Sequence, residues 1–231
     1  MGDDLSWLPF LLQTSDALFP TGAYAHSLGF EEAVRLGLIR DEPTLRSFLL
    51  DHIVPAQREQ ELPYLRFAFA AAVECDIDEL CRVDAEIGAW KLARETREAS
   101  TQLGGRRLTA LRGISSVGLL LEFGNAIRRG SARGHHLTVC GLQAAVEKVP
   151  LEAALSAFFY LSLSAICGAA MKLIRIGQSG SQRVLREAAA TAGDSIRLSL
   201  TVQRASAGWF NPLLEIASMR HERAEERLFI S

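Results

Sequence analysis

A tyrosine, a histidine and a serine stand close together near the start of the chain, at Tyr24, His26 and Ser27. They follow a turn at Pro20-Thr21-Gly22 that ends an apolar run, and they precede a segment with helical periodicity. Residues of these types could form an active site, a ligand cage or a docking surface. These residue types alone do not distinguish among the three kinds of site, so the rest of the chain must be considered.

Established motifs for nucleotide binding, serine chemistry and zinc are missing from the sequence. The turn GQSGS at 177–181 has neither the spacing of a phosphate-binding loop nor that of a nucleophile elbow. His221 and Glu222 begin HERAE, which lacks the second histidine that a zincin helix places four residues after the first. Glu95 and Glu98 lie one helical turn apart, but their arginine neighbours favour an ion-pair lattice over an acid/base dyad. We expect no catalytic residue, no cofactor and no metal ligand.

Two further sets of residues keep other chemistry open. His135, His136 and Cys140 could bind a transition metal if a helix had begun there, but polar loop residues beside a core cysteine are the simpler interpretation. A compact all-α enzyme of thiaminase-like type could use a buried Cys167 or Cys140 beside Tyr160 and a carboxylate. Such an enzyme would carry a reactive thiol of low pKa, whereas a scaffold would not.

Composition indicates one sizeable globular domain, which we expect to span residues 1–231. The chain has 48% hydrophobic and 23% charged residues, so it is too apolar to be disordered. A formal net charge of -2 supplies no positive field for nucleic acid or an anionic membrane. Uninterrupted apolar runs are short, such as 67–73, and the apolar segment after Pro150 is predicted to be a buried helix rather than a membrane span. The acidic start MGDDLSWL and four dispersed cysteines indicate a cytoplasmic protein with reduced thiols.

Helical periodicity predicts an all-α fold, a single globular helical domain of about eight to ten helices. Residues 23–38 form one expected helix, with Glu31, Glu32 and Arg35 on its wet side. Residues 197–202 alternate like a strand, but they have no hairpin partner, so helix is predicted there as well.

Prolines and glycines predict where several helices begin and end. Pro43 and Pro63 each suit the first turn of a helix. The run ELCRVDAEIGAWKLARETREASTQL, which Asp78 could cap, is expected to contain two helices, because Gly88 weakens it, and to end at Gly104-Gly105. The basic, glycine-containing segment 125–138 is the expected exposed loop.

The stretch LLQTSDALFPTGAYAHSLGFEEAV contains a leucine-glutamine pair, a Pro-x-Gly turn and an aromatic-x-His-Ser-x-Gly helix start. In these features it resembles the first of four ordered motifs of the UreF family of urease accessory proteins. The later pieces are RETREASTQLGGRRL, MKLIRIGQSGSQRVL and the terminal RHERAEERLFIS. Arg175 stands where the family usually has a proline before its leucine-glycine-glutamine turn. The chain is thus similar to UreF proteins over nearly its whole length.

This resemblance implies an all-helical protein with no catalysis of its own. Such proteins join a second accessory protein of the UreD type, also called UreH, and recruit the GTPase UreG. The assembly delivers nickel to the urease apoenzyme. A scaffold can bias a GTPase simply by binding one of its nucleotide states more tightly, which needs no nucleophile. Dimerisation would let two GTPase copies face each other across a two-fold axis, so a homodimer is expected.

The resemblance also implies which residues contact partners. The tyrosine after the Pro-x-Gly turn and the arginine of the terminal RLFxS piece are implicated in holding the GTPase, and here they are Tyr24 and Arg227. Tyrosine and arginine are also the side chains that often dominate contact energies. Phe229 lies in an apolar hook after Arg227 that could pack on the UreD-type partner. His221 and Glu222 match the terminal motif, although they could simply pair within the last helix.

Overall fold

The computed structural model describes residues 5–21, 29–115 and 118–221. Every regular element in these ranges is helical, which confirms the predicted all-α fold of about eight to ten helices. The stretch that alternates like a strand forms the end of helix α12 (Ala192–Thr201), as predicted. Tertiary packing, rather than local alternation, therefore decides the conformation of this segment.

The chain divides into two compact units, each assembled from segments that are distant in sequence. Unit 1 consists of residues 1–22, 64–90 and 100–157, and unit 2 consists of residues 23–63, 91–99 and 158–231. Helices α7 (Arg94–Ile114) and α10 (Leu151–Leu173) contribute residues to both. The expectation of one domain over residues 1–231 stays a prediction.

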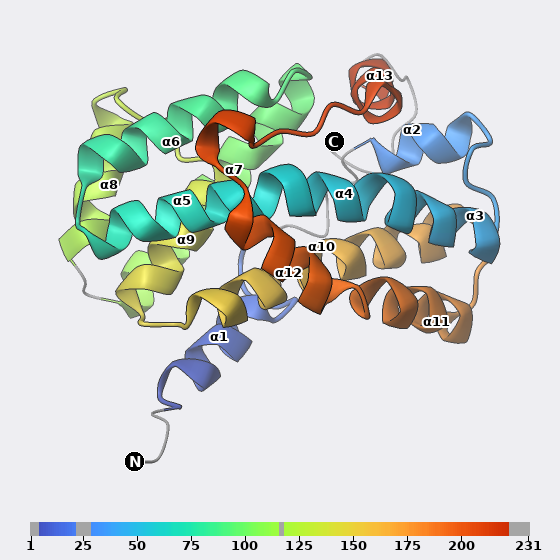
Figure 1. Ribbon diagram of the computed structural model, residues 1–231, viewed down its shortest axis with the longest axis horizontal. Coiled ribbons are helices and arrows are strands. Elements are labelled where there is room, and N and C mark those ends of the chain that lie inside the picture. The colour runs from blue at the N-terminus through green and yellow to red at the C-terminus, as the bar shows by residue number, and fades with distance from the viewer. Residues whose placement is uncertain (1–4, 22–28, 116–117, 222–231) are drawn as a thin grey trace. The chain divides into compact units, whose positions relative to one another are not determined.

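The remaining helices fall within one unit or the other. Unit 1 holds α1 (Trp7–Ser15), most of α5 (Leu62–Val73), α6 (Ile77–Trp90), α8 (Gly118–Arg128) and α9 (His136–Val146). Unit 2 holds α2 (Phe30–Arg35), α3 (Glu42–Phe48), α4 (Val54–Ala56), α11 (Gln178–Ala189), α12, a 3-10 turn (Arg204–Ser206) and α13 (Pro212–His221). In unit 1, α6 packs against α8 and α9, and in unit 2, α13 packs against α2 and α11 against α3 (Figure 1).

Residues 42–73 form one uninterrupted helical run, which corrects the prediction that Pro63 begins a helix. Pro43 does lie in a first turn, behind an Asp41 cap whose side chain accepts the N–H of Thr44 at 3.0 Å. Within the run, the π-helical segments Leu49–Ile53 and Gln57–Glu61 precede Pro55 and Pro63. A proline ring in an α-helix clashes with the carbonyl four residues before it, and the wider π turn relieves that clash.

Helix α7 passes straight through Gly104-Gly105, which corrects the prediction that a helix ends there. The predicted break in the long run does exist, but it falls after Trp90 rather than at Gly88. Gly104 is needed for packing: a Cβ atom there would lie 2.0 Å from the carbonyl oxygen of Gly134. The glycine thus lets the loop before α9 touch the α7 backbone.

The expected exposed loop at 125–138 is shorter and more buried than predicted. Residues 125–128 belong to α8, and 136–138 belong to α9. His135 is completely buried, with its Nδ1 atom 3.1 Å from the hydroxyl of Ser100. The side chain of Asp84, also fully buried, accepts backbone N–H groups of this loop and so holds it against α6.

Helix α10 is a core helix in both units. Its Leu155, Phe159 and Leu163 side chains have no exposed surface, which confirms the predicted buried helix after Pro150. Within the part of the chain that the structure describes, α10 is the one helix long and apolar enough to cross a membrane, although the sequence analysis predicted none. Core helices of soluble proteins also have this length and composition, and 44% of the relevant window is buried here.

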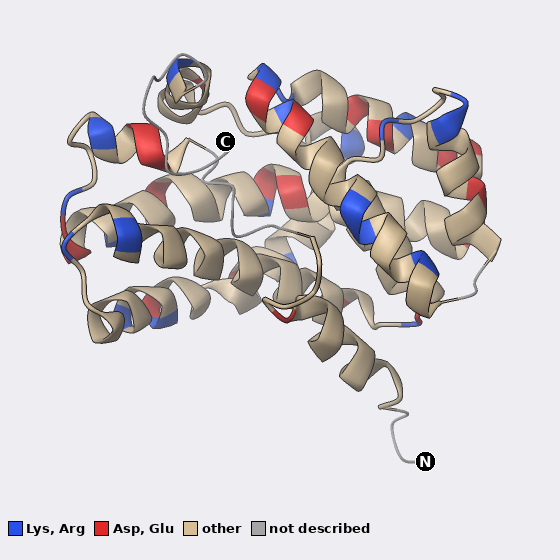
Figure 2. Ribbon diagram, turned by 180° about the vertical axis from the view of Figure 1, so that it is seen from behind, with Lys and Arg blue, Asp and Glu red and all other residues tan. Residues whose placement is uncertain are grey.

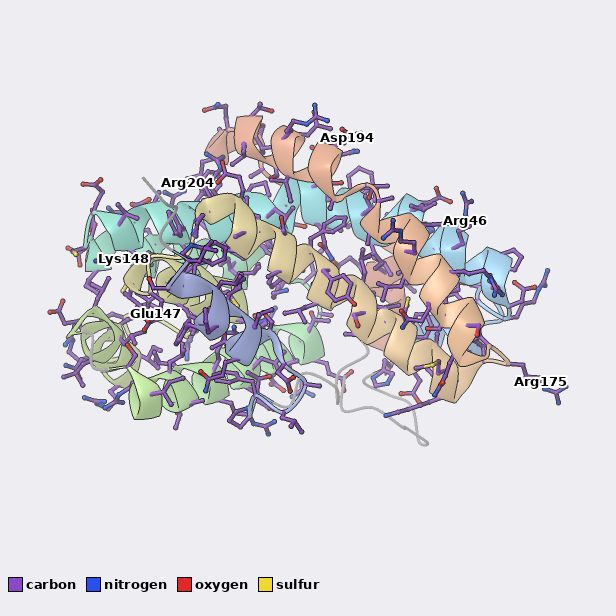
Figure 3. All side chains as sticks on the ribbon, turned by 90° about the horizontal axis from the view of Figure 1, so that it is seen from below. Arg46, Glu147, Lys148, Arg175, Asp194 and Arg204 are labelled. Atoms are coloured by element: carbon purple, nitrogen blue, oxygen red, sulfur yellow. The ribbon has the colours of Figure 1, made fainter. Side chains whose placement is uncertain are left out.

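Helices α3 and α11 are joined by two ion pairs of opposite polarity, one helical turn apart. Arg183 donates to Glu42 through two nitrogens, at 2.9 and 2.7 Å, and Arg46, which is labelled in Figure 3, pairs with Glu187. A Cβ atom at Gly180 would lie 2.8 Å from a Glu42 carboxylate oxygen. The glycine of the GQSGS turn therefore makes room for this carboxylate rather than for a phosphate.

Arg175, which stands where the resemblance led us to expect a proline, lies in the turn between α10 and α11. The N–H of Ile176 donates to the carbonyl of Ile174 at 2.9 Å, so Arg175 is the central residue of a three-residue turn. Its side chain is exposed and points away from the helices (Figure 3). The central residue of such a turn has a φ close to that of proline. The turn therefore accepts either residue.

Candidate functional site

Only one of the five predicted partner-contacting residues lies among those that the structure describes. His221 is the last residue of α13 and of the described chain. Tyr24, Glu222, Arg227 and Phe229 lie outside the described residues, as does His26. The site is therefore built here from His221 and the side chains that surround it, all of which belong to unit 2.

Helix α13 reaches α2 through a close approach at Gly29. This residue caps α2 with a φ of 85°, a left-handed conformation that favours glycine. A Cβ atom on it would lie 2.6 Å from the Ser218 hydroxyl and 3.2 Å from the Ser218 backbone nitrogen. The glycine of the HSLGFEEAV motif therefore allows α13 to pack directly on the start of α2.

His221 lies between two carboxylates from helices that are far apart in sequence. Its Nε2 atom is 3.0 Å from Glu31 in α2, and its Nδ1 atom is 2.9 Å from Glu95 in the first turn of α7. The His221 side chain is 1% exposed, and those of Glu31 and Glu95 are 14% and 13% exposed. One imidazole ring thus joins three helices in a site that is almost closed to water.

A third carboxylate, that of Glu32, lies beside this group and is buried. Arg35 donates to Glu32 through two nitrogens at 2.6 and 2.7 Å, and Arg220 of α13 lies 3.1 Å from the same carboxylate. The hydrogen bonds from Arg35 lower the pKa of Glu32, against the opposing effect of burial. Figure 2 shows basic and acidic residues interspersed along the helices rather than gathered by sign.

Glu31 and Glu32 correct the prediction that both lie on the wet side of their helix. Glu32 is 1% exposed because α13 covers that side of α2 and brings Arg220 to it. Arg35 does remain half exposed, as predicted. The helix ends at Arg35, before the expected Leu38, and residues 23–28 of the predicted helix lie outside the described residues.

Glu31 and Glu95 are the functional candidates that sequence reasoning missed. Glu95 was grouped with Glu98 in an ion-pair lattice, and Glu98 does lie 3.3 Å from Arg94. Glu95 also faces His221, 126 residues away. No local spacing relates these residues, so the signal that could have found them is the co-occurrence of the motifs FEEAV, RETRE and RHE in one family.

The geometry around His221 does not suit a metal ion. Its two carboxylate neighbours lie at opposite ring nitrogens, so a single ion could not bind both and the ring together. No group of three or more His, Cys, Asp or Glu side chains within residues 5–21, 29–115 and 118–221 has the geometry of a metal site. His135, His136 and Cys140, considered as ligands above, belong to this searched range.

The cysteines of the alternative enzyme are not poised for catalysis. Burial raises the pKa of Cys167 to about 11 and also raises the pKa of Cys140, so both are protonated thiols near neutral pH. Tyr160, the proposed neighbour of the thiol, is 48% exposed, whereas Cys167 is buried on the same helix. These environments are typical of cysteines that pack a core.

The fold and the site define an all-helical protein in which a buried charge cluster joins α2, α7 and α13. Residues 39–189 match the model of the UreF family. The chain is 37% identical, over 96% of both chains, to the urease accessory protein UreF of Paenarthrobacter aurescens (strain TC1). It is 31% identical to that of Arthrobacter sp. (strain FB24) and 29% identical to that of Bacillus sp. (strain TB-90), over 96% of this chain in each case. The chain belongs to the UreF family.

Proposed function

We propose that this protein is a non-catalytic scaffold for nickel insertion into urease. In this role it binds a UreD/UreH-type accessory protein, recruits the GTPase UreG and reaches the urease apoenzyme through that complex. It works in the cytoplasm as a homodimer, without a cofactor of its own and without nucleic acid or membrane as partners. Family membership and the protonated, buried thiol of Cys167 support a binding role over an enzymatic one.

One observation carries the proposal: the tie between α2 and α13. Through the contacts of Gly29 with Ser218 and of Glu31 with His221, the helix that follows Tyr24 is fixed to the helix that precedes Arg227. Tyr24 lies seven residues before Glu31, and Arg227 six residues after His221. A chain extends at most about 3.6 Å per residue, so the connecting segments limit Tyr24 to within about 25 Å of Glu31 and Arg227 to within about 22 Å of His221. This arrangement supports a shared partner for the two residues.

The scaffold needs no chemistry of its own to act on a GTPase. If it binds one nucleotide state of the partner more tightly than the other, it shifts the equilibrium between those states by the ratio of the two affinities. Tyr24 and Arg227 are suited to such a contact, since one offers rigid amphipathic area and the other a planar fork of donors. Phe229 and its apolar neighbours serve mainly the UreD-type partner in this division of labour.

Pull-downs of each partner by point variants test the proposal. Tyr24→Ala and Arg227→Ala should each weaken GTPase binding at least about thirtyfold, the effect of losing ~2 kcal/mol at a hot spot. Both should leave the UreD-type complex intact, whereas deletion of residues 228–231 should weaken both complexes. Tyr160→Ala and Arg175→Ala, which remove an exposed tyrosine and an exposed arginine elsewhere, are matched controls.

Thermal unfolding of every variant shows whether the fold is retained. If the Tyr24→Ala and Arg227→Ala variants both bind the GTPase as strongly as the wild-type protein does, these two residues do not form the GTPase contact. If the wild-type protein binds neither partner, the proposed scaffold function is wrong.

A further inference from the structure

Arg107 is a buried cation whose charge has no acidic partner among the residues that the structure describes. It lies in α7, in the GGRRL end of the second motif, and is 8% exposed. Its Nε atom donates to Oε1 of Gln143 at 2.6 Å, and its Nη2 atom donates to the carbonyl of Thr14 at 3.2 Å. Both acceptors are neutral, and no described aspartate or glutamate forms an ion pair with the guanidinium. Buried charges in proteins are usually paired, so the arrangement indicates a partner from outside the chain.

The unused donors of Arg107 are accessible. A guanidinium carries five N–H groups, and two of them serve the acceptors named above. The Nη1 atom is not among the buried polar atoms that lack a partner, so it reaches the surface. The edge formed by Nη1 and Nη2 matches the two oxygens of a carboxylate. Glu147, one turn after Gln143 on α9, forms no ion pair with Arg107, and its Oε1 atom is buried without a hydrogen-bond partner.

Aromatic and aliphatic side chains accompany this donor edge. The centroid of the Phe19 ring lies 5.5 Å from the central carbon of the guanidinium. Along the same segment of the chain, Leu12 is 63% exposed and Leu18 is 91% exposed. Asp16, the acid of this segment, is exposed, and its Oδ1 atom accepts the N–H of Leu18 at 2.7 Å. A largely desolvated arginine beside exposed aliphatic side chains is typical of the centre of a protein interface.

We infer that Arg107 anchors a docking surface for the UreD-type partner, to which that partner contributes an acidic side chain. Leu12 and Leu18 pack against aliphatic neighbours of this acid. The inference rests on the proposed function, which links the GTPase to α2 and α13 of unit 2, whereas the surface around Arg107 belongs to unit 1. A carboxylate occupies the unused N–H groups and neutralises the buried charge. A partner without one leaves the cation unpaired, so the surface selects for an acid.

Binding of the purified UreD-type protein to arginine variants, followed by biolayer interferometry, tests this inference. Arg107→Gln removes the charge and the fork but keeps an amide donor for Gln143 or Thr14. It should weaken the complex at least about thirtyfold, mainly through faster dissociation. Arg107→Lys keeps the charge without the planar fork and should fall between this variant and the wild type. Arg106→Gln changes the exposed neighbouring arginine and should bind within about twofold of the wild type.

A leucine variant tests the same surface without altering a buried residue. Leu18→Ser should leave thermal unfolding unchanged, because the side chain is 91% exposed, and it should weaken the complex about tenfold. Leu198→Ser, at an exposed position of α12 in unit 2, is its matched control and should bind like the wild type. If Arg107→Gln fails to fold, Leu18→Ser and Arg107→Lys still decide the question.

A double-mutant cycle distinguishes a contact of Arg107 from a purely structural role. One aspartate or glutamate of the partner, changed to its amide, should weaken the wild-type complex strongly and the Arg107→Gln complex hardly at all. If no acid of the partner behaves in this way, or if Arg107→Gln and Leu18→Ser both bind at full strength, the inference is wrong. Weakened binding of the GTPase alone would contradict the choice of partner. If the wild-type protein does not bind the UreD-type protein, the proposed function itself fails.

Discussion

The hydroxyl of Thr138 donates to the carboxylate of Asp84 at 2.8 Å, although the two residues lie on different helices and neither has exposed surface. Asp84 also accepts the backbone N–H groups of Arg133, Gly134 and His135, at 2.5, 3.0 and 2.7 Å. One carboxylate thus satisfies four donors at the start of α9 and fixes the loop that leads into it.

Asp84→Asn should be among the most destabilising single changes in unit 1. The amide nitrogen would face N–H groups that need an acceptor, and the loss of charge weakens every remaining bond. We expect a loss of about 2–4 kcal/mol in the free energy of unfolding, measured by urea titration. Asp78→Asn, at an exposed position of the same helix, should change it by less than about 0.5 kcal/mol. Equal effects of the two substitutions would contradict the role of Asp84.

Gly104→Ala and Gly105→Ala should have effects of opposite sign. A Cβ atom at Gly104 would meet the Gly134 carbonyl, whereas at Gly105 no other atom lies within 4 Å. The first variant should lose about 2 kcal/mol or more through overpacking. The second should gain about 0.5–1 kcal/mol, because alanine suits a helix interior better than glycine. Chemical denaturation of both variants checks this, and a stable Gly104→Ala variant would show that α7 and the loop are not in contact.

Alkylation of the native protein should distinguish the cysteines by environment. With a pKa of about 11, roughly one Cys167 thiol in a thousand is ionised at pH 8, and burial slows access further. Cys75 is exposed and should react first with iodoacetamide, while Cys140 and Cys167 should react only after denaturation. Mass spectrometry of digested samples reports each site. Rapid, stoichiometric labelling of native Cys167 or Cys140 would support the alternative function of a thiol enzyme.

The stability contributed by Glu32 should disappear in acid. Hydrogen bonds from Arg35 lower its pKa below the ordinary 4.5, so its ionised form stabilises the fold above that pH and the contribution is lost as pH falls through the lowered value. Glu32→Gln should cost about 1.5–3 kcal/mol at neutral pH, as expected for bonds to a charged group. The difference from wild type should shrink at about pH 3, as followed by urea unfolding at both pH values. A constant difference would show that the charge of Glu32 is not responsible.

Much of the fold could be predicted from the sequence, because apolar periodicity marks helices wherever it is strong. The wrong predictions concern residues whose local conformational preference is outweighed by their surroundings in the fold. Gly104 was expected to end a helix, but it lies inside one, because the Gly134 carbonyl occupies the space that a side chain at this position would fill. Pro63 was expected to begin one, but a π turn before it lets the helix continue. Neither the nearby backbone nor the π turn is visible in local spacing.

Less of the candidate site was predictable. The terminal motif identified His221, but its partners Glu31 and Glu95 are 190 and 126 residues away in sequence. A charged residue on a helix is usually solvated, so Glu31 and Glu32 were expected on the wet side. Only the packing of α13 on α2 turns that side into an interior, and this packing depends on Gly29 and Ser218.

The contact of His221 with Glu31 and Glu95 makes the order of synthesis matter. Glu31 leaves the ribosome 190 residues before His221, a delay on the order of ten seconds at ~20 residues per second. Throughout that interval the nascent chain holds Glu31 and, later, Glu95, without the imidazole that joins them. A prematurely terminated chain therefore keeps both acids and lacks their bridge. Only a translation product that extends through His221 can complete the contact of α2, α7 and α13.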